Sequence, residues 1–149
     1  YNVGSSITSY IRKNPIDHVA IRQFAKRRNP INHPTVMFRK ADILACNSYE
    51  SCPLFEDYYL WAKMLTKGYL LSNLPEVLVE TEVDSNYFRR RGGMSYVKNE
   101  IRLVRQLKQI GFISSIEASV FLLSRLPMRS VPVWLRQYMY RTFLRTNCD

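Results

Sequence analysis

The stretch F-E-D-Y-Y-L-W-A-K-M-L-T-K-G-Y, residues 55–69, gives the clearest indication of the fold. Before it, Ser51 is placed to cap a helix with Pro53 at its start, and Gly68 is placed to end that helix. Apolar side chains recur through the segment at helical spacing, at Leu54, Tyr58, Trp61 and Leu65. The sequence therefore predicts a helix that buries one face in a core.

Upstream, a second helix is predicted over residues 15–28. Asn14 offers an N-cap side chain, Pro15 suits the first helical position, and Asp17 complements the positive end of the helix dipole. The residues Arg-Arg-Asn-Pro at 27–30 end the helix. Its predicted apolar face consists of Ile16, Val19, Ala20 and Phe24.

Strands are expected between and beyond these helices. The β-branched, apolar run at 34–39 predicts a buried strand, and a short helix is expected after it, from Lys40 to Cys46. Two more strands are predicted, at Tyr69–Ser72 and at Val77–Val83, and the second alternates apolar and polar residues, as expected with one wet face. The opening run, 1–11, is also strand-like.

After residue 92 the pattern becomes helical. An apolar stripe ends at Gly111, a second helix is predicted over 115–125 with a stop near Pro127, and a last helix is expected from Pro132 to about Arg145. The stripe of the first of these helices consists of Val97, Ile101, Val104 and Leu107. An α/β part followed by a helical tail is the expected architecture.

Composition limits the class of protein. At 149 residues with 46% hydrophobic residues the chain has the size and composition of one globular domain, or part of a larger one. Residues 1–84 carry ten Lys/Arg against nine Asp/Glu, whereas residues 85–149 carry twelve against three, so the net charge of +10 belongs mainly to the last third. The three cysteines fit neither a disulfide framework nor a zinc site, and a chain that opens on Tyr1 is expected to be an excised or processed piece.

Three motifs occur in an informative order: R-R-N-P-I-N-H-P-T-V-M-F-R-K at 27–40, the stretch at 55–69 already quoted, and Y-F-R-R-R-G-G-M-S at 87–95. Together they resemble the second half of bacterial family-2 glycosyltransferases of the polysaccharide and capsule-biosynthesis type, which have a GT-A fold. The resemblance covers residues 1–95 well and the helical tail loosely.

This resemblance implies the fold class α/β, as the C-terminal half of a GT-A-like fold with few short strands and a helical extension. Residues 1–93 would form the acceptor-side part of the domain, and residues 94–149 a basic helical extension packed on it. The implied reaction is inverting transfer of a sugar from a nucleotide-diphospho-sugar to an acceptor hydroxyl. The acceptor would be a saccharide or a lipid-linked sugar.

Such a transfer needs a carboxylate that takes the proton of the acceptor hydroxyl. The resemblance places that base at the Glu56-Asp57 pair, with Asp57 as the preferred residue. A helix N-terminus favours an ionised carboxylate, which suits a proton acceptor. The alternative from the residues alone is that both acids only complement the helix dipole.

Cations must stabilise the charge of the departing diphosphate. Arg89, Arg90 and Arg91, followed by two glycines, match the loop that closes over the donor phosphates in such enzymes, and at most two of the three can contact phosphate. A solvated basic turn is the alternative reading. Residues expected to line the donor or acceptor site are His33, Asn32 and Arg28, with a structural histidine as the alternative for the first.

No Asp-x-Asp motif is present, although such carboxylates would hold the Mg²⁺ or Mn²⁺ expected in the full-length parent. The chain alone is therefore expected to be inactive. A cytoplasmic location is predicted, with peripheral attachment to the inner face of the plasma membrane left open, because the basic aromatic helices after Arg125 could lie on an anionic membrane surface. The alternative function is a non-catalytic basic helical module that binds nucleic acid or a membrane surface, although no nucleic acid-binding motif is found.

Overall fold

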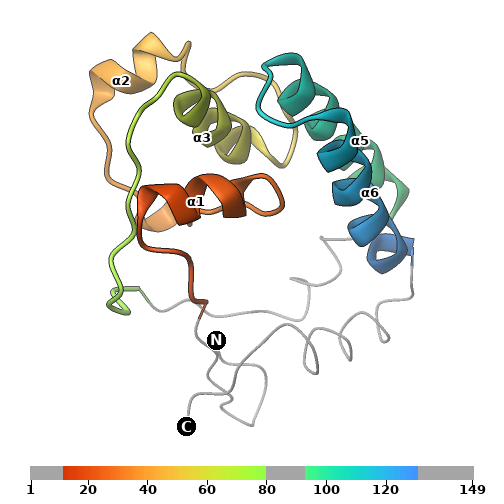
Figure 1. The fold of residues 1–149 in the computed structure, drawn as a ribbon, viewed down its shortest axis with the longest axis horizontal. Coiled ribbons are helices and arrows are strands. Elements are labelled where there is room, and N and C mark those ends of the chain that lie inside the picture. The colour runs from red at the N-terminus through yellow and green to blue at the C-terminus, as the bar shows by residue number, and fades with distance from the viewer. Residues whose placement is uncertain (1–11, 80–92, 131–149) are drawn as a thin grey trace, which may run out of the picture.

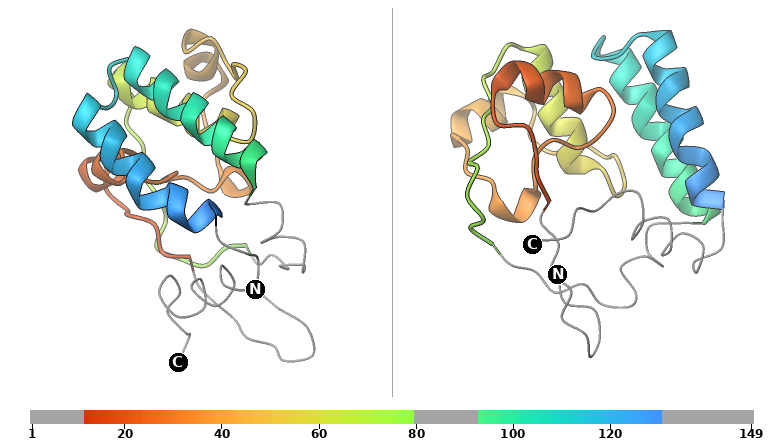
Figure 2. Two further views of the ribbon diagram at one scale, coloured as in Figure 1. Left: turned by 90° about the vertical axis from the view of Figure 1, so that its right-hand side faces the viewer. Right: turned by 60° about the horizontal axis from the view of Figure 1, so that its bottom comes forward.

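The computed structural model describes residues 12–79 and 93–130, with side chains up to residue 125. The described elements are all helices, and they are α1 (His18–Ala25), the 3₁₀ helix η1 (His33–Thr35), α2 (Lys40–Ala45), α3 (Glu56–Thr66), α5 (Met94–Gln109) and α6 (Ser115–Ser130). The helices α5 and α6 form a hairpin on one side, and α1, α2 and α3 form the other part (Figure 1). Figure 2 shows the same division from two further directions.

Helix α3 is the centre of the packing. All residues from Tyr58 to Leu65 are buried, including the charged Lys63. One hydrophobic cluster joins α3 to α1, α5 and α6, and a second cluster joins it to α2 and to Ile31. Because α3 is buried on all sides, the prediction that only one face of this helix is buried was too narrow. Leu54, assigned to that face, is 57% exposed.

The start of α3 also differs from the prediction. Neither Ser51 nor Pro53 begins the helix, because Leu54 has a φ of 72°, which is incompatible with a right-handed helix. The helix begins at Glu56 with Phe55 as the N-cap residue. Its end agrees with the prediction, since Gly68 has a φ of 84° just after the last turn.

Helix α1 is shorter than predicted. Asp17, and not Asn14, is its N-cap residue, and the Asp17 side chain accepts a hydrogen bond from the backbone N–H of Ala20 at 2.9 Å. Because the helix begins at His18, its buried positions are Ile21 and Ala25. The predicted face was wrong for Ile16 and Val19, which are 49% and 69% exposed, whereas Ala20 and Phe24 are half-buried.

The strands predicted at 34–39 and 69–72 are not formed. Pro34 belongs to η1, and Met37, expected in a buried strand, is 97% exposed. The second segment is instead bonded near the start of α1, where the backbone N–H of Leu71 donates to His18 Nδ1 at 3.4 Å and Ser72 Oγ donates to the carbonyl of Ile16 at 3.1 Å. Residues 77–79 are also not in a strand, while the rest of that predicted strand and the run 1–11 lie outside the described residues.

A strand needs a neighbouring strand for its backbone hydrogen bonds, and no partner strand is present within 12–79 and 93–130. The GT-A-like assignment itself stays a prediction.

The predicted short helix is confirmed as α2, and the predicted helix with the apolar stripe is confirmed as α5, followed by Gly111 with a φ of 70°. Helix α6 continues past Pro127 and is described as far as Ser130, so the predicted stop near Pro127 was wrong. Its start is a capping box, in which the backbone N–H of Ser114 donates to Glu117 at 2.8 Å and the N–H of Glu117 donates to Ser114 Oγ at 3.2 Å. The helix expected from residue 132 lies outside the described residues.

A buried ion pair joins the two helices of the hairpin, and its arginine also binds the rest of the domain. The carboxylate of Glu100, on α5 and fully buried, contacts the Arg125 guanidinium of α6 at 2.8 Å. Arg125 also donates to the backbone carbonyl of Arg27 at 2.7 Å, and its guanidinium lies 4.4 Å from the centre of the Phe121 ring. Because charged groups are buried only when partners compensate them, this arrangement fixes α6 against both α5 and the end of α1.

Candidate functional site

Asp57 occupies the first turn of α3, where the chain turns out of the α2–α3 loop. The left-handed backbone of Leu54 prevents an earlier helix start, so Glu56 and Asp57 come directly after the N-cap residue. Glu56 is exposed to solvent, whereas Asp57 is half-buried. Of the two predicted acids, Asp57 therefore has the more restricted surroundings.

Both carboxylate oxygens of Asp57 accept hydrogen bonds. The side-chain amide of Asn29 donates to Oδ2 at 2.8 Å, and the backbone N–H of Tyr58 donates to Oδ1 at 2.7 Å. These bonds fix the orientation of the carboxylate, and a general base needs in addition an acceptor hydroxyl within hydrogen-bond reach. The role as a dipole-complementing acid remains compatible with the same position.

Tyr49, in the loop before α3, contacts His33 and is affected by the charge of Asp57. Burial raises the pKa of the Tyr49 phenol, and the negative charge of Asp57 raises it further. The Tyr49 hydroxyl lies 2.9 Å from His33 Nε2, and their ring centroids are 5.7 Å apart. His33, a predicted site residue, is thus bonded to Tyr49, and neither residue hydrogen-bonds to Asp57 in the described part of the chain.

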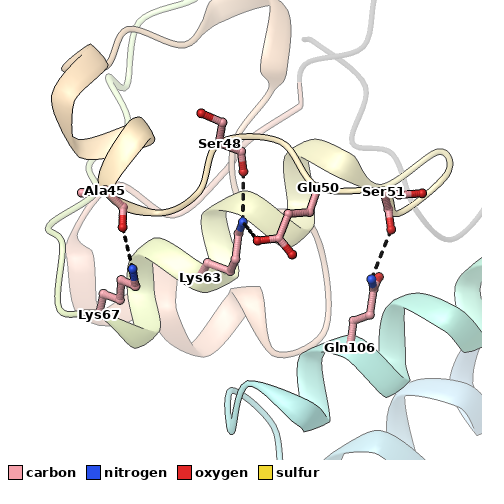
Figure 3. A network of polar contacts seen from close by, with 7 residues as sticks. All are labelled: Ala45, Ser48, Glu50, Ser51, Lys63, Lys67 and Gln106. Atoms are coloured by element: carbon pink, nitrogen blue, oxygen red, sulfur yellow. Dashed lines mark hydrogen bonds and ion pairs between the residues drawn. The ribbon is translucent and has the colours of Figure 1, made fainter.

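The loop from Cys46 to Phe55 that carries Tyr49 is held by side chains of α3 and α5 (Figure 3). The buried ammonium of Lys63 donates to the carbonyl of Ser48 at 3.0 Å and pairs with the Glu50 carboxylate at 2.8 Å. From α5, the Gln106 amide donates to the carbonyl of Ser51 at 3.2 Å. These contacts restrict the loop, and with it the place of Tyr49.

The other predicted site residues have different positions. Asn32 is half-buried as the N-cap residue of η1, and its carbonyl accepts a hydrogen bond from Thr35 Oγ1 at 2.9 Å. Arg28 is exposed beyond the end of α1. Neither side chain contacts Asp57 in the described part of the chain, and Arg89, Arg90 and Arg91 lie outside it.

A buried aromatic side chain, Trp61, lies next to His33. Trp61 is 1% exposed, and its ring centroid lies 6.4 Å from that of His33 and 6.3 Å from that of Phe38. The prediction that Trp61 and Tyr58 are core residues is confirmed by their burial. The indole Nε1 of Trp61 is buried and makes no hydrogen bond to any described group.

Two residues of this neighbourhood were missed by sequence reasoning. Asn29 was interpreted only as part of a helix stop, although it lies within the quoted motif at 27–40. Tyr49 carried no recognisable signal, because its place depends on a loop held by distant side chains. The Asn29 position in the motif was the one signal that could have drawn attention to the residue.

A site for a divalent metal ion needs several His, Cys, Asp or Glu side chains close together. Within 12–79 and 93–125, no group of three or more His, Cys, Asp or Glu side chains could hold a metal ion. Cys46 and Cys52 are buried free thiols. The described residues thus contain no such ligand set for Mg²⁺ or Mn²⁺.

None of the helices in these ranges is long and apolar enough to cross a lipid bilayer.

Comparison with known proteins finds three similar glycosyltransferases. The amylovoran biosynthesis glycosyltransferase AmsE of Erwinia amylovora is 35% identical over 133 residues, which are 87% of this chain and 49% of that protein. An uncharacterised glycosyltransferase of Haemophilus influenzae is 34% identical over 141 residues, 95% of this chain and 52% of the relative.

The third relative is the Escherichia coli UDP-Gal:alpha-D-GlcNAc-diphosphoundecaprenol beta-1,3-galactosyltransferase, 32% identical over 126 residues, 85% of this chain and 46% of the relative. The chain thus spans about half the length of these curated relatives. No protein-family model and no solved structure matches it. These relatives confirm the predicted resemblance to glycosyltransferases.

Proposed function

We propose that this chain is the acceptor-side part of a family-2, GT-A-like inverting glycosyltransferase that acts in cell-surface polysaccharide synthesis. The observation that carries the proposal is the similarity to three glycosyltransferases over 85–95% of the chain. One of them, by its name, acts in amylovoran biosynthesis, and another, by its name, transfers galactose from UDP-Gal to a diphosphoundecaprenol-linked GlcNAc. A nucleotide-diphospho-sugar donor and a lipid-linked or saccharide acceptor are therefore the proposed substrates.

In the proposed reaction Asp57 is the general base. Its carboxylate takes the proton of the acceptor hydroxyl while the hydroxyl oxygen forms a bond to the anomeric carbon of the donor sugar. The bond from that carbon to the diphosphate oxygen breaks, and the nucleoside diphosphate leaves with the electron pair. The hydrogen bonds from Asn29 and Tyr58 support this role, because they fix the carboxylate before the acceptor arrives.

The charge that develops on the leaving diphosphate must be stabilised. We assign this to the arginines at 89–91, which the sequence places beside two glycines and which lie outside the described residues. A divalent cation would add positive charge at the diphosphate when bound in the full-length parent.

Exposed apolar side chains in the extended segment 69–79 support the GT-A-like part of the proposal. Leu70, Leu74 and Leu78 are 82%, 70% and 68% exposed. In the full-length parent we expect other parts of the protein to cover these side chains. We also expect strands that pair with this segment, because a strand needs a partner for its backbone hydrogen bonds. Amide hydrogen exchange tests the idea: residues 74–79, whose backbone N–H groups donate to no described residue, should be protected in the full-length parent but exchange rapidly in the 149-residue chain. Equal rapid exchange in both proteins would count against it.

The function is tested by sugar transfer from a panel of nucleotide sugars to a membrane lipid extract, with the full-length parent as the enzyme. Asp57→Asn removes the proposed base, and Asp42→Asn is a matched control because Asp42 is also a carboxylate in the first turn of a helix, α2. We expect transfer by the wild type and by Asp42→Asn, and a loss of at least about 100-fold in Asp57→Asn.

Full activity of a folded Asp57→Asn protein would leave Asp57 only the role of complementing the helix dipole. Absence of transfer by the wild type would favour the alternative function, a non-catalytic basic helical module that binds nucleic acid or a membrane surface. The 149-residue chain alone should show no transfer, and appreciable turnover by it would contradict the proposed division of the enzyme.

A further inference from the structure

We infer that Asn29 is the positioning residue of the proposed base: its side-chain amide sets the orientation in which the Asp57 carboxylate meets the acceptor hydroxyl. The inference rests on the proposed function and adds a residue that the motif comparison did not single out. Asn29 and Asp57 are 28 positions apart in the chain, so the contact is made by the fold.

The orientation of the Asn29 amide is fixed from both ends. Its Nδ2 donates to Asp57 Oδ2 at 2.8 Å, while its Oδ1 accepts the backbone N–H of Ile31 at 3.3 Å. A flipped amide would place its oxygen against the carboxylate and lose both bonds. The main chain at the same residue is also held, because Arg12 Nη2 donates to the Asn29 carbonyl at 2.7 Å. Asn29 is thus a fixed donor and not a mobile surface amide.

The chemistry favours an amide at this place over a cation. A hydrogen bond from a neutral group orients a carboxylate without adding a positive charge, whereas a contacting Lys or Arg would stabilise the anion strongly and make it a weaker proton acceptor. Within the described ranges Asp57 makes no ion pair, and its two hydrogen bonds come from the amide of Asn29 and the backbone of Tyr58. Each carboxylate oxygen keeps further lone pairs for the incoming hydroxyl.

The charge of Asp57 acts on two titratable side chains before α3, Tyr49 and Cys52. Glu56 is its exposed neighbour on α3. Burial raises the pKa of the Cys52 thiol to about 11, the charges of Glu56 and Asp57 raise it too, and Arg102 of α5 opposes the shift. Since Tyr49 and Cys52 both stay neutral near pH 7, a carboxylate introduced at position 29 would be the main new charge that acts on the base.

The test uses steady-state kinetics of the full-length parent over a range of pH, with two variants at position 29. Asn29→Ala removes the donor and should lower kcat about 10- to 100-fold, with KM for donor and acceptor within about twofold. Asn29→Asp keeps the shape but places a second carboxylate against the first, so the acidic limb of the pH profile of kcat should move upward by about one pH unit.

Gln23→Glu is the matched control. It also converts an amide to a carboxylate, but at an exposed side chain of α1. Its kcat and pH profile should equal those of the wild type. Far-UV circular dichroism and thermal melting check that each variant is folded. If Asn29→Ala does not fold, the pH profile of Asn29→Asp, which keeps the side-chain shape, decides the question.

The outcomes separate this inference from the proposed function. An inactive Asp57→Asn protein together with wild-type kcat and pH profile in the folded Asn29 variants would overturn the positioning role alone. An active Asp57→Asn protein, or an inactive wild type, would overturn the proposed function and this inference with it. A lower kcat, an unchanged KM and a shifted acidic limb, seen only at position 29, would establish the role.

Discussion

The buried hydroxyl of Tyr58 should contribute a measurable part of the stability of the domain. Tyr58 is 1% exposed, and its hydroxyl donates a 2.6 Å hydrogen bond to the carbonyl of Ala25 in the last turn of α1. The carbonyls of a last helical turn have no partner within their own helix, so this phenol satisfies a buried acceptor. In Tyr58→Phe the ring remains and no large cavity forms, but the acceptor loses its donor.

The expected cost follows from that geometry. A buried acceptor left without a donor costs about 1–3 kcal/mol. In a domain of this size that corresponds to a fall in Tm of about 3–9 °C. Urea unfolding of the 149-residue chain, followed by far-UV circular dichroism, should show a lower midpoint with an unchanged m value.

The adjacent residue provides the control. Tyr59 lies on the same helix and is 6% exposed, but its hydroxyl makes no hydrogen bond to a described residue. Tyr59→Phe should change the free energy of unfolding by less than about 0.5 kcal/mol. If Tyr58→Phe is as stable as the wild type, or if both variants lose the same stability, the reasoning from the buried hydrogen bond is refuted.

Three further changes give distinct expected results. Gly68→Ala should destabilise the chain by about 1 kcal/mol in urea unfolding, because Gly68 has a φ of 84° and an added Cβ would meet no atom within 4 Å, so the cost is conformational alone; an unchanged midpoint would contradict this. Hydrogen bonds, first of all from Lys26, lower the pKa of Glu117 from its ordinary value of 4.5 to about 2, so the stability from this carboxylate is present above pH 5 and is lost as the pH falls toward 2. Glu117→Gln should therefore flatten the fall in unfolding free energy between pH 5 and 2, and parallel wild-type and variant curves would argue against it. Lys63→Met removes the bonds from the Lys63 ammonium to the Ser48 carbonyl and to Glu50, so limited proteolysis should cut the loop before α3 faster than in the wild type, and equal cleavage rates would show that the loop is held by other contacts.

Local sequence signals determined where several helices exist and end. The apolar periodicity of α3 and α5 and the glycines at 68 and 111 were sufficient, because helical spacing and a left-handed C-terminal residue are properties of a short segment. The S-x-x-E pattern at Ser114 and Glu117 also defines a helix start by local bonds alone. The acids Glu56 and Asp57 could be named from sequence because the motif that resembles glycosyltransferases lies in one short segment.

The tertiary structure decided what those segments meet. Periodicity could not show that α3 is buried on every side, since burial depends on what packs there from α1, α2, α5 and α6. Strand propensity at 34–39 and 69–72 produced no strand, because a strand exists only with a partner for its backbone groups. The same reason applies to the candidate site: the Asn29–Asp57 bond spans 28 positions, and only the packing of the segment after α1 against the start of α3 brings the amide to the carboxylate.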